Sequence, residues 1–150
     1  MSSTRALYEQ VILDHNKNPR NFGVLREPDH TVEGFNPLCG DHFTIYVKLD
    51  GDRISEITFE GAGCAISKSS ASVMTTVLKG KTVKEAEVIF KDFHHMITSA
   101  PDAPVDEEAV GKLRIFSGVR EFPVRIKCAT LAWHAMNSAL HGKDSAISTE

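Results

Sequence analysis

The sequence predicts an α+β fold in which a small three-stranded antiparallel sheet packs against several helices. Two observations lead to this prediction. Residues 43–60 alternate apolar and polar side chains at the two-residue period of half-buried strands, and apolar residues recur at helical spacing on both sides. An order of helix, then strands, then helices is typical of α+β proteins. The 150 residues suit one domain, residues 1–150, because no repeat or linker divides them.

The first half of the chain predicts one helix and the whole sheet. Apolar side chains fall on one face of residues 4–17, and Asn18-Pro19 ends that helix. Residues 18–30 are rich in Asn, Pro, Gly and charged residues, which predicts a loop. Asp50-Gly51 is a hairpin-turn signal between two alternating segments. The predicted strands are residues 31–34, 43–49 and 54–60.

The second half of the chain predicts helices only. Gly80 is a natural C-terminal cap for the first of them. Thr82 and Glu85 have the capping-box spacing that begins the next helix. Residues from about 142 to 150 form a polar tail, which we expect to fray. The predicted helices are residues 65–79, 82–95, 107–116 and 126–140.

Composition and charge argue against several classes of protein. The formal net charge is −3, so nothing favours a nucleic-acid partner or an anionic membrane surface. No stretch approaches the roughly 20 apolar residues of a spanning helix, and the first residues lack the apolar run of a secretory signal. We therefore expect a cytoplasmic protein with no membrane partner, in which a reducing environment disfavours disulfides.

Cys39, Cys64 and Cys128 each lie at a predicted structural transition. Cys39 precedes the long alternating strand, Cys64 follows a Gly-Ala-Gly segment where a helix begins, and Cys128 lies at or near the start of the last helix. Helix N-termini stabilise thiolate relative to thiol, so such positions favour reactive or metal-binding sulfur. Asp41 follows Cys39 by two residues, and a turn at Gly40 can aim both side chains at one point.

A metal centre built from these residues has competing interpretations. Zinc prefers four tetrahedral ligands drawn from Cys, His and carboxylates. Thiolates also hold iron–sulfur clusters, so residue types alone do not separate the two. A single cysteine is more often a small buried apolar residue, and Asp41 by itself would be a turn residue. Arg125 and Lys127 precede Cys128, and they can either offset the negative charge of such a centre or contact a partner. The candidate metal ligands are Cys39, Asp41, Cys64 and Cys128.

Three segments resemble the cysteine motifs of the iron–sulfur cluster scaffold family, the IscU-like proteins. The resemblance covers about residues 5–141 and implies the IscU-like fold. Lys127 stands where the cluster-building scaffolds have His, and extra sequence lies around residues 96–118. Both departures resemble the SufU branch of the family. The three segments are Asn36-Pro37-Leu38-Cys39-Gly40-Asp41, Gly61-Ala62-Gly63-Cys64-Ala65-Ile66-Ser67 and Lys127-Cys128-Ala129-Thr130-Leu131-Ala132-Trp133.

The resemblance to the SufU branch implies a function, a metal and partners. It implies a zinc-dependent sulfur acceptor, or sulfurtransferase, that takes persulfide sulfur onto Cys39 from a cysteine desulfurase of the SufS type. It also implies downstream cluster-assembly proteins as recipients of that sulfur. The alternative is a non-catalytic scaffold on which an iron–sulfur cluster is assembled, so the status of the chain as an enzyme stays open. The zinc ligands implied are Cys39, Asp41, Cys64 and Cys128.

Overall fold

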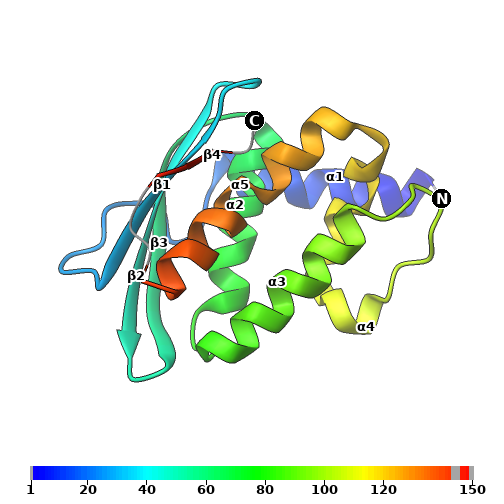
Figure 1. Cartoon of the computed structure of the whole chain (residues 1–150). Helices are drawn as coiled ribbons and strands as arrows, with labels where there is room; N and C mark the ends of the chain where they lie inside the picture. The colour runs from blue at the N-terminus through cyan, green and yellow to red at the C-terminus, as the bar shows by residue number, and fades with distance from the viewer. Residues whose placement is uncertain (1, 143–145, 149–150) are drawn as a thin grey trace.

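Helices cover one face of a four-stranded sheet in the computed structural model, which describes residues 2–142 and 146–148 (Figure 1). No helix in these ranges is long and apolar enough to cross a membrane. The elements in chain order are α1 (Ser2–Lys17), β1 (His30–Asn36), β2 (Asp41–Asp50), β3 (Arg53–Ala62), α2 (Ala65–Leu78), α3 (Val83–Ile97), α4 (Glu107–Val110), the 3-10 helix η1 (Gly111–Glu121), α5 (Pro123–Leu140) and β4 (Ile147–Ser148).

The sheet has the strand order β3-β2-β1-β4, and its first three strands are antiparallel as predicted. The prediction of only three antiparallel strands is wrong, because Ile147 and Ser148 pair in parallel with Gly34 and Phe35 of β1. These two residues lie in the segment predicted to be a frayed tail. The outer edge of β1 offers unpaired backbone groups, and half-buried Ile147 packs against the hydrophobic core. Both features stabilise a strand that is too short to give an alternating pattern.

The alternation that predicted the central strands matches their burial. Ile45 and Val47 of β2 pair with Phe59 and Ile57 of β3, and all four side chains are fully buried. This apolar face packs against α2 and α5. The contact between these two helices includes the buried Trp133. The apolar face therefore fixes the register of the sheet, because a one-residue slip would expose all of these side chains.

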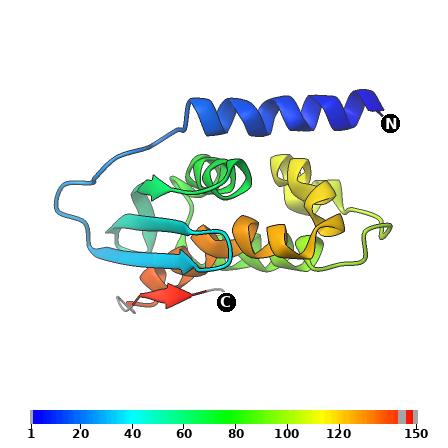
Figure 2. The same ribbon diagram turned by 90° about the horizontal axis from the view of Figure 1, so that it is seen from above.

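Helix α1 forms an outer layer beside α2, and the loop that follows it runs around the end of the sheet (Figure 2). His15 is buried at this contact, where its Nδ1 lies 2.7 Å from Ser72 Oγ of α2. The exposed side of α1 retains apolar residues, including Leu7 and Leu13. The first helix is thus attached to the remainder of the fold through a polar contact as well as apolar packing.

The last third of the chain differs from the prediction at two helix boundaries. Residues 107–116, predicted as one short helix, are divided between the single turn α4 and the longer η1. Helix α5 begins at Pro123, three residues before the predicted start at Ile126. Proline suits the first position of a helix because its missing N–H would have no helical partner there. Cys128 consequently lies in the second turn of α5, inside the helix.

Candidate metal centre

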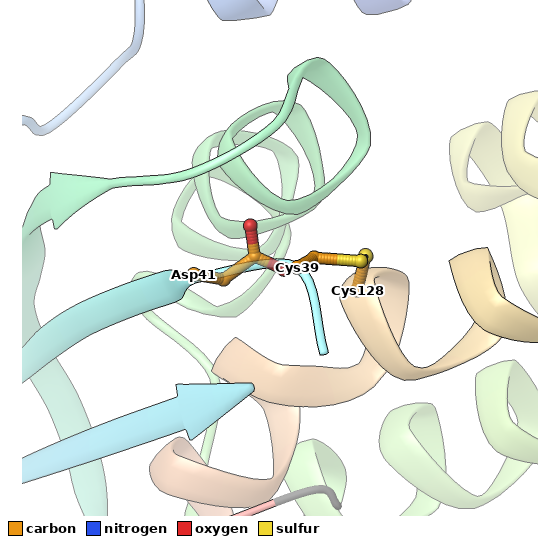
Figure 3. Close-up of side chains that lie close together, drawn as sticks. All are labelled: Cys39, Asp41 and Cys128. Carbon is orange, nitrogen blue, oxygen red and sulfur yellow. The ribbon is translucent and has the colours of Figure 1, made fainter. Parts of the chain in front are cut away.

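Two thiols and one carboxylate meet where the β1–β2 turn contacts α5. The Sγ atoms of Cys39 and Cys128 and a carboxylate oxygen of Asp41 all lie within 4.8 Å of one another (Figure 3). Cys39 lies on the turn and is half-buried, Asp41 begins β2, and Cys128 comes from α5; the last two are buried. The structure therefore brings together three of the four predicted ligands.

The carboxylate of Asp41 is held by three hydrogen-bond donors. Its Oδ1 accepts from the backbone N–H of Cys64 at 2.9 Å and from the hydroxyl of Ser67 at 3.1 Å. Its Oδ2 accepts from the side-chain amide of Asn36 at 3.2 Å. Three donors of this kind satisfy both oxygens of the carboxylate and fix its orientation. A buried, oriented carboxylate is ready to act as a metal ligand.

Asn36 links the carboxylate to one of the thiols. It is fully buried at the end of β1, and its Nδ2 also donates to Cys128 Sγ at 3.4 Å. Its Oδ1 has no hydrogen-bond partner in the described part of the chain. This role of Asn36 was not predicted from the sequence, where Asn36 stands only as the first residue of the Cys39 motif. The available signal was a polar residue at the end of a strand, five residues before the proposed ligand Asp41.

Cys128 lies in an environment that favours the neutral thiol in the absence of a metal. Its Sγ is 3.3 Å from that of Cys39. Burial, followed by the contacts with Cys39 and Asp41, raises the pKa of Cys128. The predicted stabilisation of its thiolate by a helix N-terminus is wrong, because the residue lies in the second turn of α5. A nearby cation, such as a metal ion, would reverse this preference.

Cys64, the fourth predicted ligand, lies beside the group formed by the other three. It is the N-cap of α2, as the sequence predicted, and its sulfur accepts the backbone N–H of Ser67 at 3.4 Å. Among the described residues, the three-donor group does not include its sulfur. Its backbone N–H nevertheless binds Asp41, so Cys64 lies beside the centre. Its role as a ligand stays a prediction.

A glycine allows this close packing. A Cβ atom on Gly63 would lie 2.5 Å from both Asp41 Oδ1 and Ser67 Oγ. No heavy-atom contact of this kind is tolerated, so a side chain here would displace the carboxylate or the hydroxyl. The Gly-Ala-Gly segment before Cys64 therefore has a packing function at the centre.

The two basic residues before Cys128 have separate surroundings. Arg125 is exposed, and hydrogen bonding to Cys128, followed by the charges that Cys64 and the other cysteines carry as thiolates, raises the pKa of its guanidinium. Lys127 is half-buried and instead lines a cavity between α3, α5 and β4. Arg125 is thus the residue placed to offset negative charge at the thiols.

The donor set fits a metal ion. Two cysteine sulfurs and a carboxylate are ligand types that zinc uses in proteins, and thiolates also bind iron. Hydrogen bonds to the carboxylate and to one sulfur supply the outer contacts typical of metal centres. The fold and the site together define a small α+β metal-binding protein.

Comparisons with known proteins identify the family. The model of the NifU-like N terminal domain matches residues 7–141. The zinc-dependent sulfurtransferase SufU of Bacillus subtilis is 45% identical over 135 residues, which cover 89% of each chain. The iron–sulfur cluster assembly scaffold protein IscU of Streptococcus pyogenes is 39% identical over 140 residues, covering 93% of this chain and 86% of that protein.

A solved structure agrees with these sequence relatives. The crystal structure of a candidate iron–sulfur cluster assembly scaffold protein for the SUF system, from Fervidobacterium islandicum, superposes with a TM-score of 0.82. It is 35% identical and covers 91% of this chain and 98% of the other. The chain belongs to the NifU-like N-terminal domain family, which includes the IscU and SufU proteins of iron–sulfur cluster assembly. The resemblance found in the sequence is confirmed.

Proposed function

We propose that this protein is a zinc-dependent sulfur acceptor of iron–sulfur cluster assembly, and that Cys39 receives persulfide sulfur from a cysteine desulfurase. The observation that carries the proposal is the group of Cys39, Asp41 and Cys128, in which Cys39 is the more accessible of the two thiols. The similarity to SufU of Bacillus subtilis, named as a zinc-dependent sulfurtransferase, supports it.

The proposed ligands are the three grouped residues and Cys64. Bound zinc would hold the cysteine sulfurs as thiolates near neutral pH. The chain's own residues prepare the centre: Asn36 and Ser67 orient the carboxylate of Asp41, and Arg125 places positive charge at the thiols. Cys64 is the proposed fourth ligand because its backbone already contacts Asp41.

The transfer step requires a nucleophilic sulfur on this chain. The thiolate of Cys39 attacks the outer sulfur of a persulfide carried by the desulfurase. A new S–S bond forms at Cys39 while the S–S bond of the donor persulfide breaks, and the desulfurase cysteine leaves as a thiolate. The two-electron oxidation of Cys39 to a persulfide is balanced by the reduction of the desulfurase persulfide to a thiolate, so no outside oxidant is needed. Leu38, exposed beside Cys39, places an apolar side chain where a partner would approach.

The proposed partners are a desulfurase of the SufS type and downstream cluster-assembly proteins that take the sulfur onward. We place the reaction in the cytoplasm, because sulfur transfer through thiols and persulfides needs a reducing compartment that spares them from disulfide formation. IscU relatives from bacteria support a role in cluster assembly.

Persulfide transfer is tested by mixing the protein with a SufS-type desulfurase and free cysteine. Mass spectrometry of the alkylated peptides should show one added sulfur atom on Cys39. The variants Cys39→Ala and Cys39→Ser should accept none, and Asn18→Ala, altered at an exposed position in the loop after α1, should accept as much as the unaltered protein. Sulfur acceptance by Cys39→Ala would contradict the assignment.

The second candidate function is a scaffold on which an iron–sulfur cluster is built. The adjacent sulfurs of Cys39 and Cys128, 3.3 Å apart, and the similarity to IscU proteins favour it. Lys127 favours the sulfur-acceptor proposal, because it resembles the SufU branch at that position. Anaerobic reconstitution with iron and sulfide separates the two: stable visible absorbance would support the scaffold.

A further inference from the structure

The cavity between α3, α5 and β4 is lined by residues that the proposed sulfur chemistry does not use. Its volume is about 480 Å³, within the range of small-molecule sites. Isoleucine side chains, Ile126 and Ile147, form part of its wall. Its polar lining consists of His94, Lys127, Thr130, His134, Asn137 and Ser138, with Ser148 at the β4 side.

The polar lining has one sign of charge. The lining contains Lys127 and two histidines, and no carboxylate among the described residues. Glu87, an acidic residue on the adjoining helix α3, contacts His141, with 3.2 Å between its Oε1 and the imidazole Nε2. Among the described lining residues the charged side chain is that of Lys127, so this lining favours an anion over a metal cation.

Four hydrogen-bonding side chains in this cavity lack partners. Lys127, His134, Asn137 and Ser138 are all half-buried, and none of these side chains makes a hydrogen bond or ion pair within the described part of the chain. These half-buried side chains have hydrogen-bonding capacity that no other described side chain or backbone group uses, so they are available to a bound acceptor. All four come from α5, so one helix presents an ammonium, an imidazole, an amide and a hydroxyl to the cavity.

The histidine in this set is held in place by aromatic neighbours. The ring of His134 meets Phe90 edge-on at 5.3 Å between centroids, and His94 lies 5.8 Å away in a similar arrangement. Burial, followed by the charge of His94, lowers the pKa of His134. A neutral imidazole retains one N–H, which can donate to an acceptor in the cavity.

We propose that this cavity binds the oxyanion group, carboxylate or phosphate, of a small molecule. Lys127 supplies the charge, and His134, Asn137 and Ser138 supply neutral donors. Charge-assisted hydrogen bonds to such oxygens are stronger than those between neutral groups. The site is separate from the proposed sulfur transfer, because none of its donors is a proposed metal ligand.

The test is an NMR titration of the zinc-loaded protein. Sodium phosphate and sodium acetate are added in separate arms, with sodium chloride keeping the ionic strength constant. The proposal expects saturable shifts in the α5 amide signals from Lys127 to Ser138 and in the ring signals of His134. The arm that saturates at the lower concentration identifies which oxyanion the site prefers.

Two variants make the test specific. Asn137→Asp puts a carboxylate of nearly the same shape into the cavity, and Lys127→Gln removes its ammonium; each should weaken binding by about tenfold or more. The matched control is Lys84→Gln, at an exposed lysine on α3 outside the lining, and it should bind as before. Zinc content is measured for every variant, so that loss of the metal centre is recognised.

Two results would overturn the proposal. Shifts that rise linearly without saturating, equally with chloride, would show non-specific ion effects only. Saturable binding that both Asn137→Asp and Lys127→Gln leave unchanged would place the anion elsewhere, such as at the metal centre. Either result is independent of persulfide transfer to Cys39, which is measured separately.

Discussion

At the scale of single residues, the metal centre depends on how one carboxylate is held. Asp41 is nearly fully buried, and donors from β1, α2 and the segment before α2 surround its two oxygens. Without such donors the buried carboxylate would lose the contacts that fix its orientation towards the two thiols. Residues that never touch the metal are therefore expected to control its binding.

Asn36→Ala tests this directly. The substitution removes the amide that donates to both Asp41 and Cys128. We expect zinc to bind roughly ten- to hundredfold more weakly, because outer hydrogen bonds to ligands have effects of that size. Competition with a chelator of known affinity measures the change. Asn18→Ala is the control at an exposed asparagine, and equal affinity for all three proteins would contradict this role of Asn36.

Gly63→Ala tests the packing beside the carboxylate. The added Cβ would lie 2.5 Å from Asp41 Oδ1 and Ser67 Oγ. We expect destabilisation of roughly 1–3 kcal/mol, typical of overpacking, together with reduced zinc content. Gly118→Ala is the matched control, since a Cβ there meets nothing within 4 Å. Thermal unfolding and metal analysis compare the two, and similar behaviour would show that Gly63 is replaceable.

The sequence predicted that Cys39 and Asp41 would lie together, but it did not predict the residues that support them. Cys39 and Asp41 are close in the chain, so a turn at Gly40 predicted their meeting. Asn36 and Cys128 are 92 positions apart, and only the docking of α5 on β1 brings their side chains together. Hydrogen bonds across such separations leave no local pattern in the sequence.

At the scale of elements, the start of α5 decides the environment of Cys128. Apolar spacing located the helix but placed its start at Ile126, because the preceding residues are exposed and give no periodic signal. Pro123 sets the true start, so Cys128 is buried within the helix. Strand β4 was missed for a related reason: its two residues are too few to show alternation.

The contact of α1 with α2 predicts how stability depends on pH. Burial, followed by the charge of Arg20, lowers the pKa of His15 below its unfolded value of 6.5. The unfolded chain then binds more protons between these two values. The free energy of unfolding should therefore fall as the pH drops below 6.5 towards the folded-state pKa, and this contribution should be constant above 6.5.

Urea unfolding, measured from about pH 5 to about pH 8, checks this dependence. His15→Gln should reduce the dependence, because the variant has no titrating group at the contact with Ser72, and the lowered pKa of His134 accounts for a remaining part. His95→Gln, at an exposed histidine on α3, should retain it. Parallel curves for His15→Gln and the unaltered protein would show that His15 does not cause the pH effect.

At the scale of the whole molecule, the sheet and two helices converge on one site. The β1–β2 turn carries Cys39, the exit of β3 leads to Cys64, and α5 brings Cys128 against the same carboxylate. The α+β class followed from the order of patterns along the chain. The convergence itself depends on long-range packing, and the family resemblance, not periodicity, predicted it.

Metal content of the purified protein tests the central claim most directly. We expect about one zinc per chain, set by the four proposed ligands. Asp41→Ala should lower the zinc content, whereas Asp102→Ala, at an exposed loop aspartate, should retain it. Iron with acid-labile sulfide in place of zinc, or no bound metal at all, would contradict the account.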